Sequence, residues 1–60
     1  MKVKNLPQSG YHKKRKYTVV REVDGEYWFY GSYDDVMLAG KAVIELPNGY
    51  VVESKDIEAA

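Results

Sequence analysis

The chain has 60 residues, with nine basic side chains, nine acidic side chains and no cysteine. A chain of this length buries only about 60% of the surface that its unfolded form exposes, so it has room for one small domain. The absence of cysteine excludes disulfides, thiolate metal sites and a thiol nucleophile, and it favours a reducing, cytoplasmic location. The hydrophobic fraction of 45% indicates a folded core rather than disorder.

The zero net charge conceals an uneven distribution along the chain. Residues 1–16 carry six Lys and Arg and no acid, whereas residues 17–60 carry three bases and nine acids. Such asymmetry is typical of an interaction segment, although the two halves could also pair with each other inside the molecule. No apolar stretch is long enough for a membrane span or a signal peptide, so we expect neither.

The first ten residues alternate weakly and are then interrupted by Pro7 and Gly10, which break regular elements. We therefore expect residues 1–10 to be a loosely held arm, and residues 1–16 as a whole to form a basic N-terminal arm ahead of a domain of residues 17–60. The alternative is a short edge strand added to the sheet, and propensity alone does not separate the two.

Two segments rich in β-branched and aromatic residues, Tyr17–Val23 and Glu26–Gly31, are separated only by Asp24-Gly25. Asp-Gly accepts the positive φ angles of a two-residue type I′ turn, so the pattern predicts a β-hairpin. The loop length sets the pairing, and the expected opposite pairs are Arg21 with Trp28, Val20 with Phe29, and Val19 with Tyr30.

A helix is expected next, because Ser32 is a good N-cap and the carboxylates of Asp34 and Asp35 suit the positive end of a helix dipole. Gly40 lies in its middle and costs about 1 kcal/mol relative to Ala, which suggests close approach to a ring, that of Trp28 or Phe29. The helix should bury one apolar stripe and end at Pro47. The stripe consists of Val36, Ala39, Gly40, Val43 and Leu46.

Tyr50–Ser54 is expected as a third strand that returns beside the first. The strand order would then be second-first-third, with every neighbouring pair antiparallel and the helix on one face. The predicted fold class is α+β, a two-layer β-β-α-β domain with a basic N-terminal arm.

The sequence offers little material for catalysis, and we expect no enzyme, no metal site and no cofactor. His12 is the only histidine and lies in a basic run, so we expect a solvated surface residue. Asp34 and Asp35 are explained by the helix start rather than as an acid–base pair, because consecutive helical residues point about 100° apart.

The segment YHKKRKY, Tyr11–Tyr17, is the strongest local feature. Its cations could contact an acidic partner protein or nucleic acid phosphates, or could simply be solvated at the start of a strand. A nucleic acid would meet repulsion from the acidic remainder, and the isoelectric point near 6.5 is far from basic. Aromatic residues on the uncovered sheet face, either Trp28 with Tyr30 or Tyr27 with Phe29, are a second candidate surface. The candidate binding residues are Tyr11, His12, Lys13, Lys14, Arg15, Lys16, Trp28 and Tyr30.

The run WFYGSYDD, the alanines Ala39 and Ala42 in a short helix, and the run NGYVVES resemble small open reading frames of bacteriophages and mobile elements. In layout, residues 17–54 are also similar to the short phage inhibitor of bacterial RNA polymerase, although the basic cluster here precedes the first strand. The resemblance implies an interaction protein that binds and modulates a host macromolecule, and a host protein is the expected partner. Alternatives are a nucleic-acid accessory protein that uses residues 13–16 and a structural or dimerising domain; a homodimer is a further possible partner.

Overall fold

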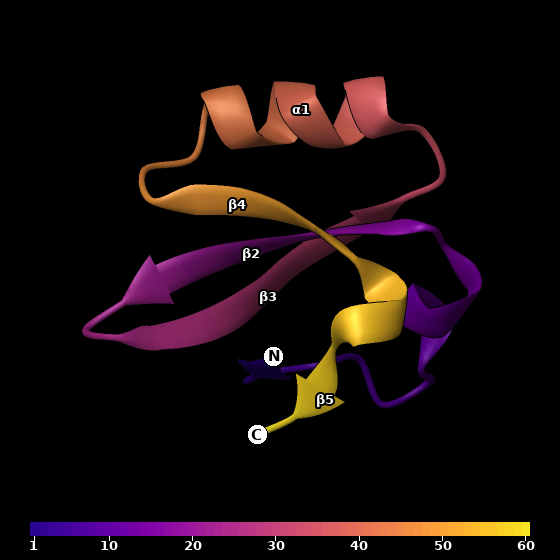
Figure 1. Cartoon of the computed structure of the whole chain (residues 1–60), viewed down its shortest axis with the longest axis vertical. Helices are drawn as coiled ribbons and strands as arrows, with labels where there is room; N and C mark the ends of the chain where they lie inside the picture. Colours follow the sequence, from indigo (N-terminus) through magenta and orange to yellow (C-terminus); the bar gives the residue numbers. More distant parts are fainter.

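The computed structural model describes all 60 residues and centres on a three-stranded antiparallel sheet in the order β3-β2-β4. Its strands are β2 (Tyr17–Val23), β3 (Glu26–Tyr33) and β4 (Gly49–Glu53). The single α-helix, α1 (Val36–Ile44), lies above the sheet alongside β4, and both chain termini lie below it (Figure 1). The predicted α+β class, strand order and antiparallel pairing are confirmed.

The hairpin turn has the predicted type I′ character. Asp24 has φ 53° and Gly25 has φ 80°, so both central residues adopt the positive φ that this turn needs. Near the turn the register is as expected, because Arg21 lies opposite Trp28 in the ladder. The predicted strand bounds Tyr17–Val23 are also confirmed.

Farther from the turn the predicted register is wrong, because β3 contains a β-bulge. Val20 lies opposite Phe29 as expected, but Val19 lies opposite Gly31 and not opposite Tyr30. Tyr30 is therefore the extra residue. A Cβ atom on Gly31 would lie only 2.9 Å from the hydroxyl oxygen of Tyr33, so glycine leaves space for the Tyr33 ring.

The helix starts later than the sequence suggested, and Ser32 is not its N-cap. Ser32 is buried in β3, where its Oγ lies 3.1 Å from Oγ1 of Thr18. The N-cap is Asp35, whose Oδ1 accepts a hydrogen bond of 2.8 Å from the backbone N–H of Met37. A carboxylate at this position also suits the helix dipole.

The explanation offered for Gly40 is also wrong. A Cβ atom at Gly40 would meet no atom within 4 Å, so neither Trp28 nor Phe29 approaches the helix there. Along the predicted apolar stripe, Ala39 is fully buried, whereas Val36 is 51% exposed. The helix therefore touches the sheet through a narrower stripe than the sequence suggested.

Residues 1–16 pack against the sheet. β1 (Lys2–Val3) pairs in parallel with β5 (Glu58–Ala59), and Val3 is buried. Lys4 then bridges to β3, because its N–H donates to the Tyr27 carbonyl at 2.8 Å and its carbonyl accepts from the Phe29 N–H at 2.9 Å. The segment is therefore held in place and is not a loose arm. β1 itself belongs to a separate two-stranded sheet, and the expected edge strand is present only as the single bridge from Lys4 to β3.

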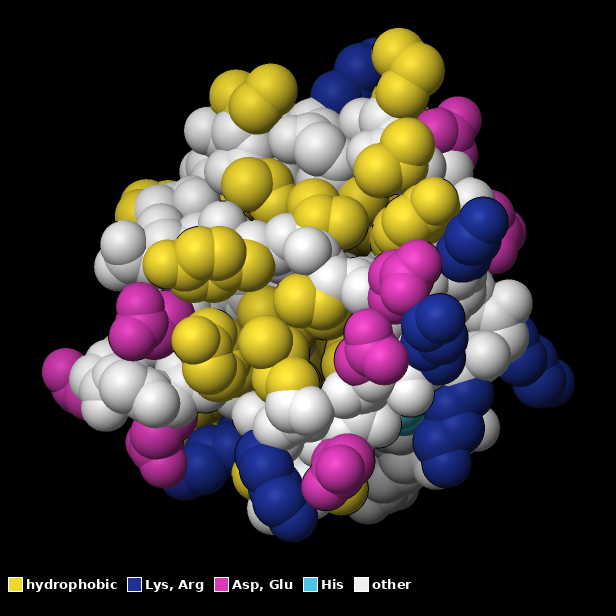
Figure 2. All heavy atoms as spheres, viewed as in Figure 1, with side chains coloured by type: hydrophobic (Ala, Val, Ile, Leu, Met, Phe, Trp, Pro, Cys, Tyr) yellow, Lys and Arg dark blue, Asp and Glu magenta, His cyan; other side chains and the backbone are white.

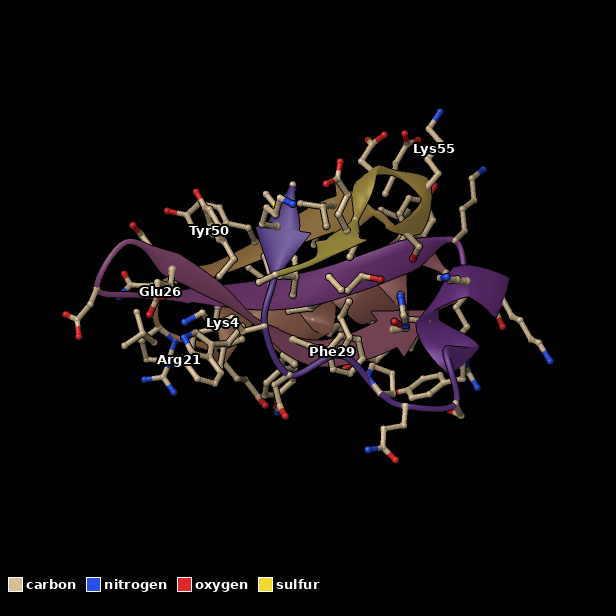
Figure 3. The ribbon with its side chains drawn as sticks, turned by 90° about the horizontal axis from the view of Figure 1, so that it is seen from below. Lys4, Arg21, Glu26, Phe29, Tyr50 and Lys55 are labelled. Atoms are coloured by element: carbon tan, nitrogen blue, oxygen red, sulfur yellow. The ribbon has the colours of Figure 1, made fainter.

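Both faces of the sheet are covered along β2. Val19 and Val20 are adjacent, so their side chains point to opposite faces, and both are fully buried. The face that holds Val20 and Phe29 is covered by the N-terminal segment, seen nearest the viewer in Figure 3. The opposite face, which holds Val19, is covered by α1. No helix in the structure has the length and apolar character needed to cross a membrane.

Candidate functional site

The basic run is positioned by a short 3₁₀-helix, η1 (Tyr11–Lys14). Gly10 precedes it with φ 70°, a conformation that glycine adopts at little cost. The Gly10 N–H donates to the Pro7 carbonyl at 3.0 Å, and the Gly10 carbonyl accepts from the Lys13 N–H at 3.0 Å. This pair of hydrogen bonds folds the chain tightly just before the cations.

His12 anchors η1 to the sheet. Its side chain is only 3% exposed, and its ring centroid lies 6.1 Å from that of Phe29; Tyr11 contacts the same ring edge-on at 6.0 Å. Burial, and then the positive charge of Lys13, lowers the pKa of His12 below its ordinary value of 6.5. The expectation of a solvated surface histidine is therefore wrong, because the neutral ring packs against an aromatic partner.

The cations that follow His12 line a cleft of about 580 Å³. The opposite wall comes from the end of β4 and from a second 3₁₀-helix, η2 (Ser54–Asp56). The two walls are joined by a hydrogen bond of 2.9 Å from the Ser54 N–H to the Lys16 carbonyl. Lys and Arg side chains gather along this side of the molecule, at the right of Figure 2. The lining residues are Lys13, Lys14, Arg15, Lys16, Asp34, Glu53, Ser54, Lys55 and Ile57.

The four consecutive cations, residues 13–16, have no ion-pair partner within the chain. Of the six N-terminal cations, Lys2 pairs with Glu58 at 3.4 Å and Lys4 pairs with Glu26. Inside the cleft, the only ion pair joins Lys55 to a neighbouring carboxylate at 3.4 Å. Pairing between the two charge-biased halves is therefore real but partial, and it leaves the cluster at 13–16 exposed to solvent.

A chain of buried hydroxyl groups lies beside the cleft. Oγ1 of Thr18 is 3.1 Å from Oγ of Ser32 and 2.7 Å from Oγ of Ser54. All three side chains are buried, so each hydroxyl depends on the others for hydrogen bonding. This contact fixes the start of η2, and with it one wall of the cleft, to strands β2 and β3.

The structure separates the two aromatic candidates. Trp28 is 39% exposed and stacks with Lys4, whose Nζ lies 5.6 Å from the ring centroid. Trp28 lies opposite Arg21 in the ladder between β2 and β3. In Figure 3, Lys4 and Arg21 lie at the end of the molecule opposite to Lys55. Trp28 is therefore not brought to the cleft. Tyr30 is 53% exposed at the β-bulge.

The pKa of Tyr33 is raised mainly by its burial, and additionally by the negative charges that Tyr30 and Tyr11 would carry when ionised. Tyr11 begins η1 and packs edge-on against Phe29, directly before His12 and the cations. Of the two exposed tyrosines, Tyr11 is therefore the one placed beside the cationic segment.

Sequence reasoning identified one wall of the cleft and missed the other. Lys55, Ser54 and Ile57 come from the far end of the chain and were not predicted. A signal was present, because the predicted order places the end of the third strand beside the start of the first. Lys55 directly follows the predicted third strand, Tyr50–Ser54, and Lys16 directly precedes the first.

Comparison of the chain with protein-family models, with curated proteins and with solved structures gives no match. The resemblance in layout to phage interaction proteins therefore stays a prediction.

Proposed function

We propose that this chain is a non-enzymatic interaction protein that binds an acidic segment of a partner protein in the basic cleft. One observation carries the proposal: residues 13–16, with no ion-pair partner of their own, and Lys55 converge on a single cleft of about 580 Å³. Such a concentration of charge speeds association with an acidic ligand. The phage-like layout favours a cytoplasmic host protein as the partner.

The composition of the cleft favours a peptide segment over a phosphate backbone. Asp34 and Glu53 contribute carboxylates to the lining, and Ile57 contributes an apolar side chain. A protein segment can meet such a mixed wall with its own mixture of acidic, basic and apolar side chains, whereas a phosphodiester chain carries only negative charge. Residues 17–60 also carry a net charge of −6, because three bases face nine acids.

Single-stranded nucleic acid is the second candidate, and the exposed tyrosines favour it. Tyr11 is 39% exposed and directly precedes the segment that holds the cations, and Tyr30 is 53% exposed at the β-bulge. Exposed aromatic rings can stack on unpaired bases while neighbouring cations contact phosphates. In this case the ligand would extend from the cleft over the tyrosines.

The two candidates are distinguished by adding a glutamate-rich peptide and an oligothymidylate separately to isotopically labelled protein at physiological salt. We expect the peptide to shift the amide resonances of residues 13–16 and Lys55, and the oligonucleotide to bind more weakly. Tighter oligonucleotide binding, with shifts that spread to Tyr11 and Tyr30, would favour the second candidate. If neither probe shifts the resonances of the cleft, the proposed function is wrong.

A further inference from the structure

The helix α1 is apolar on nearly all sides, although only one side contacts the sheet. Among its nine residues only Lys41 is charged. Ala39 is fully buried, but Met37 is 70% exposed and Ile44 is 84% exposed. A helix that is hydrophobic all round is normally buried all round, so the outer part of α1 has the character of a covered surface.

The exposed apolar flank of α1 faces the same side as the open edge of β4. In Figure 1, α1 runs from right to left above the sheet. Ala39 is fully buried, so it marks the side of the helix that faces the sheet. For a right-handed helix running in this direction the next residue is turned by about 100°, which places Gly40 on the flank toward the viewer. Val36 and Ile44 lie four residues to either side of Gly40 and share this flank. Hydrophobic side chains form a band from α1 across β4 on this face (Figure 2).

The edge of β4 lacks the usual protection against strand pairing. β4 pairs with β2 on one side and has no strand on the other, whereas the outer edge of β3 is bridged by Lys4. The sequence GYVVE contains neither lysine nor proline, the residues that commonly block such edges. The edge of β4 is therefore available for a further antiparallel strand.

The hydrogen-bond pattern shows which groups of β4 point outward. The Asn48 carbonyl accepts from Glu22 of β2 at 3.0 Å, and the Ser54 N–H donates to Lys16 at 2.9 Å, so alternate residues starting at 48 face β2. Val51 and Glu53 consequently direct their backbone groups away from β2. The carbonyl of Gly49 points the same way, while its N–H is already bonded to the Leu46 carbonyl at 3.1 Å.

We infer that this face, formed by the β4 edge and the Val36–Gly40–Ile44 flank of α1, is the docking surface for a second copy of this chain. An antiparallel pair of β4 strands centred on Val51 satisfies the outward groups symmetrically. Val51 bonds to Val51 of the second copy, and the Glu53 N–H donates to the Gly49 carbonyl of that copy. Glu53 then lies opposite glycine and not opposite another glutamate, so the strand is complementary to itself.

The same symmetry brings the two helices to packing distance. α1 packs mainly on β2 and β4 and less on β3, and neighbouring strands are about 4.8 Å apart. With the helix axis over the β2–β4 side of the sheet, the two helices would lie roughly 10 Å apart across the β4 junction. Packed helices are about 8–10 Å apart. Gly40 then has a role that the isolated chain does not provide, because its missing side chain lets the second helix approach closely.

The available area also suits a second copy. Viewed along its shortest axis, the molecule measures 28 × 25 Å, and this broad face carries the apolar band (Figure 2). A stable interface buries about 800 Å² on each partner, so a dimer contact would extend over most of this face. Only four hydrophobic residues of the single chain are buried, so the dimer would add substantially to a small core.

Analytical ultracentrifugation of the full chain and of two matched variants tests the inference. The wild type should sediment as a dimer, with twice the monomer mass of 6.9 kDa. Ile44→Lys should be a monomer, whereas Leu38→Lys, a half-exposed position on the opposite flank of α1, should remain a dimer. Circular dichroism confirms that each variant is folded. A monomeric wild type at about millimolar concentration, or equal effects of the two variants, would overturn the inference.

Disulfide cross-linking tests the register independently of the helix variants, because the chain has no native cysteine. Val51→Cys should oxidise to a covalent dimer, since the two Cα atoms would lie about 5.5 Å apart. Glu53→Cys should not, because four residues of strand separate it from its counterpart by about 13 Å. Equal cross-linking of both variants, or cross-linking of Glu53→Cys alone, would contradict the proposed pairing.

Discussion

The ring of His12 lies 6.1 Å from the ring of Phe29, centroid to centroid, and this contact joins the basic segment to the sheet. Phe29 sits opposite Val20 in the hairpin, so the histidine packs on the sheet face opposite to the one that α1 covers. The cations after His12 can therefore stay in solvent while their backbone is held in place. The buried imidazole thus helps to hold one wall of the cleft, together with the contact of Tyr11 on Phe29 and the backbone hydrogen bond that joins the two walls.

The stability of the fold should depend on pH through His12. Its pKa is lowered in the folded state by burial and by Lys13, so the unfolded chain takes up a proton at a higher pH than the folded chain. The free energy of unfolding should therefore be highest above pH 6.5 and should decrease as the pH falls through 6.5 toward the lowered pKa of the folded state. Urea unfolding between about pH 8 and pH 5 measures this.

His12→Leu is the control for that titration, because it keeps an apolar side chain of similar size against Phe29. It also removes a buried Nδ1 that has no hydrogen-bond partner. The variant should lose the part of the pH dependence that arises near pH 6.5 and keep the part that arises from carboxylates. Identical pH dependence in the two proteins would show that His12 does not titrate differently on folding.

Replacing one member of the buried hydroxyl chain should destabilise the protein. Thr18→Val leaves both Ser32 and Ser54 without their shared partner, at a cost of about 1–3 kcal/mol in the free energy of unfolding. Adding Ser32→Ala and Ser54→Ala should recover part of this loss, because no unpaired hydroxyl then remains. Denaturant unfolding of the single and triple variants measures the difference, and strictly additive losses would contradict the account.

The hairpin turn should not tolerate a β-branched residue. Gly25 has φ 80° with open space around its Cα, so Gly25→Val is penalised by backbone conformation and not by a clash. The expected loss is about 1–2 kcal/mol, seen as a lower Tm. Gly25→Asn, which accepts positive φ more readily, should be milder, and an unchanged Tm for the valine variant would argue against a type I′ turn.

Gly40→Ala should raise the stability of the monomer. No atom lies within 4 Å of the new Cβ, and alanine is favoured over glycine in a helix by about 1 kcal/mol. The measurement is urea unfolding at protein concentrations too low for self-association. A lower stability would mean that the helix has a contact at Gly40 within the single chain.

The fold was predictable wherever local chemistry determines it. The Asp24-Gly25 turn sets the hairpin register near it, and the returning strand follows from the order of elements. The bulge at Tyr30 was not predictable, because it depends on the ring of Tyr33 lying across Gly31. Local signals determine turns, whereas bulges depend on tertiary contacts.

The candidate site was likewise predictable only where local sequence determines it. The cations at 13–16 are evident in the sequence, but the burial of His12 depends on a phenylalanine that lies 17 residues further along the chain. Ser32 looked like a helix cap because serine commonly caps helices, yet in the fold its hydroxyl bonds to Thr18 of β2. Such non-local partners override local preference, and composition does not reveal them.

The central claim is that the cleft at residues 13–16 binds an acidic ligand, and two variants with equal net charge test it most directly. Lys14→Ser combined with Arg15→Ser removes two cations from the cleft, whereas Arg21→Ser combined with Lys41→Ser removes two exposed cations elsewhere. Affinity for the same glutamate-rich peptide is measured by fluorescence anisotropy at several salt concentrations. The account predicts that the first variant binds about tenfold more weakly with a reduced salt dependence, while the second stays near wild type. Equal weakening by both variants would show that total charge, and not the cleft, governs binding, and would contradict the claim.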